Sequence, residues 1–90
     1  METNKEGDVT LSVVMPAYNE GTHITDNLLE TSRVLSGFVK RYEIIAVDDG
    51  SADNTAECIH RAEMQDTHIR GISYQPNGGK GHAIRTGIAA

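Results

Sequence analysis

The sequence of 90 residues contains no tryptophan, one phenylalanine, two prolines and a single cysteine. Because a disulfide needs two cysteines, Cys58 cannot form one within the chain, and a reducing compartment is permitted. No apolar run approaches the length of a membrane span. The chain also lacks a block of basic residues, and its formal net charge is -5 at pH 7. These features argue against a nucleic-acid partner.

Several common cofactor and metal motifs are absent as well. No Gly-x-Gly-x-x-Gly follows the first predicted strand, which disfavours a nicotinamide or flavin fold, and the spacing of a Walker A loop is missing. The histidines have no metal-ligand spacing. They are His23, His60, His68 and His82.

The composition that is present, 38% hydrophobic and 23% charged, is typical of one small globular domain. Residues 1–9 are polar and acidic, unlike a signal peptide, and we expect a short disordered tail there. The domain is expected over residues 10–90. The chain stops at Ala90 inside a predicted helix and without a stop signal, so we expect a fragment of a longer protein.

Short apolar runs alternate with segments of helical spacing. Strands are expected over residues 11–15, 42–47 and 69–74, and helices over residues 22–35, 54–65 and 82–90. Pro16 cannot donate to a ladder, so we expect the first strand to end before it. Thr22 is a possible N-cap of the first helix, and Ser51 or Asp53 of the second. The unbroken apolar centre of the second strand is typical of a sheet covered on both faces.

This alternation predicts an α/β fold with parallel strands and right-handed crossovers. The carboxyl ends of parallel strands emerge at one edge of the sheet, where ligands bind in open α/β folds. Three loops meet at this edge, and they comprise residues 16–20, 48–51 and 75–81.

The first two loops each allow a functional and a simpler interpretation. Tyr18 could stack on a base while Asn19 and Glu20 hold a ribose hydroxyl, or the three could form an ordinary polar turn. Asp48 or Asp49 could accept a hydrogen bond from a base or a ribose, or could cap the following turn. Because adjacent residues point in different directions, we expect at least one of these carboxylates to contact a ligand.

The third loop contains Asn-Gly-Gly-Lys-Gly over residues 77–81. Its backbone N–H groups precede a predicted helix start and lie next to Lys80, which is a plausible arrangement for binding a diphosphate. The alternative is that Lys80 and Arg85 are solvated surface charges.

Three segments carry a family resemblance, and they comprise residues 12–20, 42–55 and 77–87. In this order and spacing they resemble family 2 glycosyltransferases over residues 11–90. Gly-Lys-Gly followed by Ala-Ile-Arg-Thr-Gly is similar to the dolichyl-phosphate mannose synthase and polyprenyl-phosphate glycosyltransferase branch.

The resemblance implies the Rossmann-like βαβαβα half of a GT-A fold, with three layers, a parallel sheet and a truncated end. It implies a GDP- or UDP-sugar donor and a lipid-phosphate or saccharide acceptor. Asp49 is our first choice for contacting the base. By position, the nucleotide-sugar-binding residues would be Pro16, Ala17, Tyr18, Asn19, Glu20, Val47, Asp48, Asp49, Gly50 and Lys80.

The sequence also departs from the family. The Asp-X-Asp motif that would bind Mg²⁺ or Mn²⁺ in the full-length enzyme lies beyond residue 90, so we expect no metal ligand and no catalytic residue in this chain. Departure of a diphosphate needs cations to neutralise its charge. We therefore expect the 90-residue chain alone to be inactive as a transferase. The alternative is a non-catalytic nucleotide-binding module that acts alone or with another chain.

Two further expectations concern the cellular location and the oligomeric state. The resemblance implies a cytoplasmic location, or the cytoplasmic face of a membrane for the full-length protein. An unpaired sheet edge favours association, so an oligomer through that edge is expected.

Overall fold

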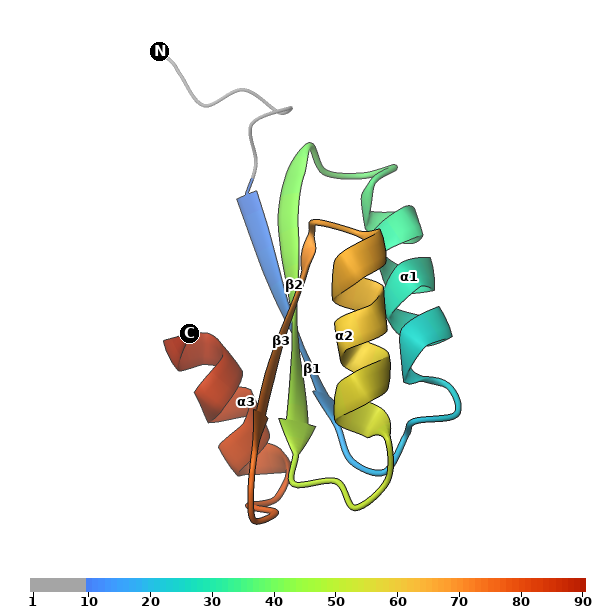
Figure 1. Cartoon of the computed structure of the whole chain (residues 1–90). Helices are drawn as coiled ribbons and strands as arrows, with labels where there is room; N and C mark the ends of the chain where they lie inside the picture. The colour runs from blue at the N-terminus through green and yellow to red at the C-terminus, as the bar shows by residue number, and fades with distance from the viewer. Residues whose placement is uncertain (1–9) are drawn as a thin grey trace.

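The computed structural model describes residues 10–90, in which three strands alternate with three helices (Figure 1). The strands are β1 (Thr10–Ala17), β2 (Arg41–Asp49) and β3 (Ile69–Tyr74). The helices are α1 (Ile24–Leu35), α2 (Thr55–Gln65) and α3 (Lys80–Ala89). Helices α1 and α2 cover one face of the sheet and α3 covers the other, which makes three layers.

The strands pair in parallel in the order β1-β2-β3. The predicted α/β class and parallel pairing are therefore confirmed. Within residues 10–90, no helix combines the length and the apolar character needed to cross a membrane. The tail expected over residues 1–9 lies outside the described residues.

Strand β2 is the centre of the molecule because it pairs with a neighbour on each side. Side chains alternate between the two faces of a strand. Ile44 and Ala46 belong to the apolar core beneath α1 and α2, whereas Ile45 and Val47 pack with Ala83 of α3. This double burial accounts for the unbroken apolar run in the sequence and confirms that the sheet is covered on both faces.

Strand β1 continues through Pro16 to Ala17, so the prediction that the strand ends before Pro16 was wrong. Pro16 pairs in register with Val47. Within the described residues, β1 borders only β2. An edge strand tolerates proline because alternate N–H groups point away from the neighbouring strand.

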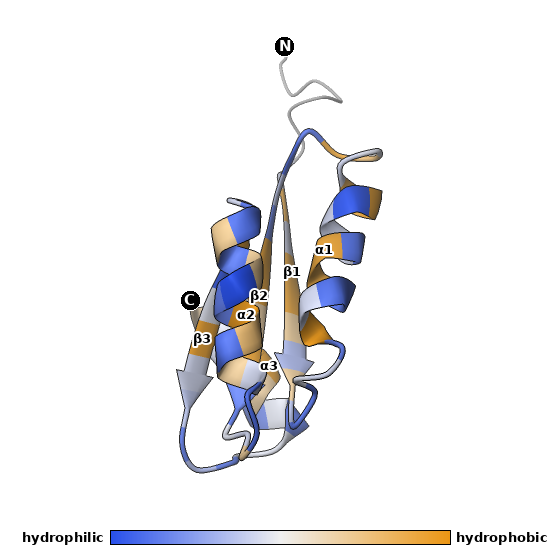
Figure 2. Ribbon diagram, turned by 45° about the vertical axis from the view of Figure 1, so that its right-hand side comes forward, coloured by the Kyte–Doolittle hydropathy of each residue, from blue (hydrophilic) through white to orange (hydrophobic). Residues whose placement is uncertain are grey.

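Helix α1 begins at Ile24, two residues later than predicted. The N-cap position is His23 rather than Thr22, and no side chain there makes a capping hydrogen bond. The inner face buries Ile24 and Leu28, as their spacing indicates, together with Ser32. Figure 2 shows apolar residues of α1 on the side that faces the sheet and polar residues over much of its outer side, although Val34 is 43% exposed.

Helix α2 has Asn54 at its N-cap, without a side-chain capping bond. Asp53 instead accepts the backbone N–H of Thr55 at 2.9 Å, so the predicted role of Asp53 at this helix start is close to the observed one. Ile59 is buried against the sheet, whereas Ala56 is exposed.

A buried polar network joins α1, β2 and the turn before β3 at the end of the sheet remote from Asp49. The hydroxyls of Ser32 and Tyr42 lie 2.7 Å apart, and Ser32 also donates to Asp66. The backbone N–H of His68 donates to Asp66 at 2.9 Å, and its ring stacks on Tyr42 with centroids 4.0 Å apart. Burial raises the pKa of Asp66, but these hydrogen bonds outweigh burial and leave it below its ordinary value.

Candidate functional site

Two adjacent carboxylates end strand β2 and point to opposite faces of the sheet. Asp48 and Asp49 are each only 3% exposed. Because side chains alternate along the strand, Asp48 lies on the face of Ala46, under α1 and α2, and Asp49 lies on the face of Val47, under α3. The two carboxylates therefore line different cavities. Within residues 10–90, no group of three or more His, Cys, Asp or Glu side chains is arranged to hold a metal ion.

Asp49 is surrounded by donors from the third loop. Its carboxylate accepts the hydroxyl of Tyr74, the side-chain amide of Asn77 at 2.6 Å and the backbone N–H groups of Gly78 and Gly79, each at 2.9 Å. The hydrogen bond from Tyr74 is the largest influence that lowers the pKa of Asp49, and it outweighs burial. In turn, burial and the neighbouring carboxylate raise the pKa of Tyr74 to about 12.

The backbone of the third loop also touches the turn that follows Asp49. Gly50 has a φ of 68°, and a Cβ at this position would lie 2.4 Å from the backbone nitrogen of Asn77. Only glycine combines this left-handed conformation with such a close approach. The side-chain amide of Gln75 donates to the carbonyl of Ser51 at 3.1 Å, and that of Asn77 donates to the carbonyl of Asp49 at 3.1 Å. The third loop is thus fastened to the second along its length.

Asp48 caps the turn that follows it, which was the simpler of its two interpretations from the sequence. Its carboxylate accepts the backbone N–H of Ser51 at 3.1 Å and so caps the turn after β2. It lines a separate cavity of about 180 Å³ between α2 and β3, together with His60, Glu63 and Ser73.

The first loop is held by the polar side chains that follow Gly50. Backbone N–H groups of residues 19–21 donate to Ser51, Thr55 and Asp53 at 2.8, 2.9 and 3.1 Å. The amide oxygen of Asn19 accepts the backbone N–H of Ala52, which directly follows the second loop, at 2.8 Å. Asn19 adopts a left-handed backbone with a φ of 53°, a conformation that asparagine tolerates better than most residues. Together with the bonds between the second and third loops, these hydrogen bonds hold all three loops together at the carboxyl edge of the sheet.

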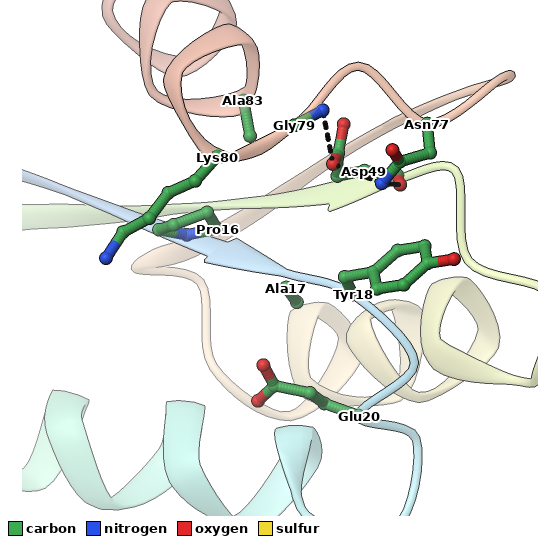
Figure 3. A pocket seen from close by; sticks show the side chains of 9 residues that line it. All are labelled: Pro16, Ala17, Tyr18, Glu20, Asp49, Asn77, Gly79, Lys80 and Ala83. Atoms are coloured by element: carbon green, nitrogen blue, oxygen red, sulfur yellow. Dashed lines mark hydrogen bonds between the residues drawn. The ribbon is translucent and has the colours of Figure 1, made fainter.

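A cavity of about 480 Å³ opens at this edge, between the end of β1, the end of β2 and the start of α3 (Figure 3). This volume is in the range of small-molecule sites. Tyr18 is 49% exposed, and in Figure 3 the Lys80 side chain extends along the other side of the cavity, over Pro16. The lining residues are Pro16, Ala17, Tyr18, Glu20, Asp49, Asn77, Gly79, Lys80 and Ala83.

Of the ten predicted site residues, six line this cavity: Pro16, Ala17, Tyr18, Glu20, Asp49 and Lys80. The other four do not line it. Val47 is completely buried beneath α3, and Asp48 faces the opposite side of the sheet. Asn19 joins the first two loops, and Gly50 forms the turn against the third loop.

The ten predicted nucleotide-sugar-binding residues did not include three lining residues, which are Asn77, Gly79 and Ala83, although Asn77 and Gly79 belong to the third loop, for which a diphosphate contact was considered. The signal for two of them was available, because a buried carboxylate such as Asp49 needs donors and the third loop is rich in them. The N–H groups of Gly78 and Gly79 donate to Asp49 and so are not free for phosphate. A diphosphate contact through Lys80 and the rest of this loop stays a prediction. Helix α3 begins at Lys80, two residues before the predicted start.

Comparison with known sequences gives a family match and characterised relatives. The sequence model described as "Glycosyl transferase family 2" matches residues 12–90. The chain is 37% identical over 79 residues to an undecaprenyl-phosphate 4-deoxy-4-formamido-L-arabinose transferase of Shewanella sediminis, a match that covers 87% of this chain and 24% of that protein. It is 35% identical over 92 residues to a dolichyl-phosphate beta-glucosyltransferase of Dictyostelium discoideum, a match that covers 94% of this chain and 28% of that protein. The chain therefore spans about a quarter of the length of these relatives.

Comparison with solved structures supports the fold. A mannosyltransferase from Pyrobaculum calidifontis, in complex with GDP-Man and Mn²⁺, superposes with a TM-score of 0.73 at 23% sequence identity. The match covers 88% of this chain and 23% of that one. The βαβαβα arrangement is thus that of a GT-A glycosyltransferase, as the sequence resemblance implied.

Proposed function

We propose, on the premise that the chain belongs to glycosyl transferase family 2, that it forms the donor-nucleotide part of a glycosyltransferase. The protein would transfer a sugar from a GDP- or UDP-sugar to a lipid-phosphate or saccharide acceptor. The names of the two relatives favour a polyprenyl phosphate as the acceptor. The observation that carries the proposal is the 480 Å³ cavity, which brings an aromatic ring, a carboxylate and a lysine together at the carboxyl edge of the sheet.

Each of these groups has a chemical role in the proposal. The exposed face of Tyr18 would stack on the base, since aromatic rings and bases attract one another through their π faces. The carboxylate of Asp49 would accept an N–H of the base. Lys80 would supply positive charge beside the diphosphate. Pro16 and Ala17 would form the apolar wall beneath the nucleoside.

The longer protein would use a divalent cation, as the presence of Mn²⁺ in the mannosyltransferase suggests. The described residues of this chain do not fit such an ion. Asp48 and Asp49 face opposite sides of the sheet, and the oxygens of Asp49 already accept four donors. We therefore propose that this part of the protein binds the nucleotide and that the cation ligands lie elsewhere in the longer protein. The chain alone would bind the donor without transferring its sugar.

Location and assembly remain predictions. A cytoplasmic location, including the cytoplasmic face of a membrane, follows from the family resemblance. Within the described residues, strands β1 and β3 each pair on one side only, which supports association through a sheet edge.

Isothermal titration of the chain with GDP, UDP and inorganic pyrophosphate tests the proposal. We expect GDP or UDP to bind more tightly than pyrophosphate, and Tyr18→Ala to weaken nucleotide binding about tenfold, because stacking contributes roughly 1–3 kcal/mol per base. Phe38→Ala is the matched control, since this aromatic residue is 82% exposed and does not line the cavity. Equal affinities for pyrophosphate and both nucleotides, or an equal loss in the two variants, would count against a nucleoside site.

A further inference from the structure

The side chain of Asn77 occupies a particular place on the Asp49 carboxylate. Its Nδ2 lies 2.6 Å from Asp49 Oδ2 and 3.1 Å from the Asp49 carbonyl oxygen. Both residues line the 480 Å³ cavity, and Figure 3 shows the Asn77 amide turned toward Asp49. An amide N–H of this chain therefore lies where the proposed function requires an N–H of the base.

The carboxylate has little capacity left for a further donor. An ionised carboxylate offers about four lone-pair sites, and Asp49 accepts Tyr74, Asn77, Gly78 and Gly79. A nucleobase can reach Asp49 only by displacing one of these donors.

The four donors differ in how much must move to release the carboxylate. Gly78 and Gly79 donate through the backbone that leads into α3, so their release would move the loop. Tyr74 belongs to strand β3 and is half-buried. Asn77 is exposed and donates through its side chain, which can rotate without any change in the backbone. Release of Asn77 breaks two hydrogen bonds, to Asp49 Oδ2 and to the Asp49 carbonyl oxygen, but it requires the smallest rearrangement of the four.

We infer that the Asn77 side-chain amide is an internal stand-in for the nucleobase: it holds the base-accepting position on Asp49 in the free protein and rotates away when a nucleotide binds. This inference rests on the proposed function. It names the ligand chemistry as a base with a ring N–H donor, such as guanine or uracil. It also explains how Asp49 stays buried and ionised without a ligand, because a bare buried carboxylate is costly.

The stand-in has a measurable consequence for affinity. When only a fraction of molecules has the Asp49 position open, the apparent dissociation constant rises in inverse proportion to that fraction. Removing the Asn77 amide should therefore strengthen nucleotide binding, whereas the loss of a residue that contacts the ligand weakens it.

The same loop offers a matched control. Gln75 also carries a side-chain amide, and it donates to the carbonyl of Ser51 at 3.1 Å rather than to Asp49. Gln75→Ala thus removes an amide anchor of the third loop without opening the carboxylate.

Titration of GDP and UDP into the unmodified chain, Asn77→Ala and Gln75→Ala tests the inference. We expect Asn77→Ala to bind one nucleotide at least about threefold more tightly and Gln75→Ala to match the unmodified chain. Affinity in Asn77→Ala that is unchanged or weaker, while the unmodified chain binds, overturns the inference and leaves the proposed function intact. Binding by Asn77→Ala alone supports the inference, and binding by no variant overturns both proposals.

A second measurement keeps the test decisive if Asn77→Ala does not fold. In the unmodified chain, nucleotide addition should shift the side-chain NH₂ resonances of Asn77 toward those of a free carboxamide, and the Gln75 side-chain signals should not move. Asn77 signals that stay in place at saturating nucleotide would contradict displacement.

Discussion

Asp48 caps its own turn through the N–H of Ser51 at 3.1 Å, whereas Asp49 holds the Asn77 amide at 2.6 Å on the opposite face of the sheet. A step of one residue along a strand thus separates a structural carboxylate from one that lines the cavity. Because Asp49 is the point to which the third loop is tied, the shape of the cavity depends on contacts between segments almost thirty residues apart, as its hydrogen bonds to Asn77 and Gly78 show.

Gly50→Ala should lower the free energy of unfolding by about 1–3 kcal/mol. The φ of 68° strains any residue with a Cβ, and that Cβ would lie 2.4 Å from the backbone nitrogen of Asn77. Urea denaturation followed by circular dichroism measures the loss. Gly37→Ala is the control, because its Cβ would meet its nearest atom at 3.5 Å and its φ is not left-handed. Similar costs for the two variants would show that the second and third loops are not in close contact.

The stability of the protein should fall in acid. The hydrogen bond from Tyr74 lowers the pKa of Asp49, and that from Thr55 lowers the pKa of Asp53, below the ordinary value of 3.8. A carboxyl with a lowered folded-state pKa binds fewer protons in the folded than in the unfolded state. Its stabilising contribution is complete above pH 3.8 and is lost as the pH falls through the folded-state pKa.

Thermal unfolding across the acid range, together with an NMR titration of the Asp49 carboxyl carbon, measures this effect. We expect the melting temperature to decline below about pH 4. The titration midpoint of Asp49 should rise in Tyr74→Phe, because this substitution removes the hydrogen bond that lowers the pKa of Asp49 most. An Asp49 midpoint at or above 3.8 in the unmodified chain would contradict the hydrogen bonding described for this carboxylate.

Local patterns in the sequence were enough to predict most of the fold. The bounds of β3 were predicted as observed, and the apolar run of β2 indicated a strand covered on both faces. The first residues of the helices were predicted less accurately. No side chain makes a capping hydrogen bond at His23, Asn54 or Gly79, so the sequence gives no sharp signal for a helix start there. We predicted that the first strand ends before Pro16 because proline disrupts a central strand. The sequence does not reveal that β1 lies at the edge of the sheet, where proline is tolerated.

The site was predictable only in part, for a similar reason. Parallel topology indicates which loops meet, and the alternation of side chains indicates that Asp48 and Asp49 diverge. Which of them faces the cavity depends on the register of β2 against α3, a tertiary property. The bond between Asn77 and Asp49 joins residues 28 apart, and no local sequence pattern encodes it. The part-buried hydrogen bond between Ser32 and Asp66 was not predicted for the same reason.

The most direct test of the proposed donor site compares the two neighbouring aspartates by titration with GDP and UDP. Asp49→Asn and Asp48→Asn make the same isosteric change on opposite faces of the sheet. We expect Asp49→Asn to weaken nucleotide binding about tenfold or more, since hydrogen bonds to charged groups contribute roughly 1.5–3 kcal/mol. Asp48→Asn should stay within about twofold of the unmodified chain, because its carboxylate does not line the cavity. A loss confined to Asp48→Asn, with Asp49→Asn binding as the unmodified chain does, would contradict the account.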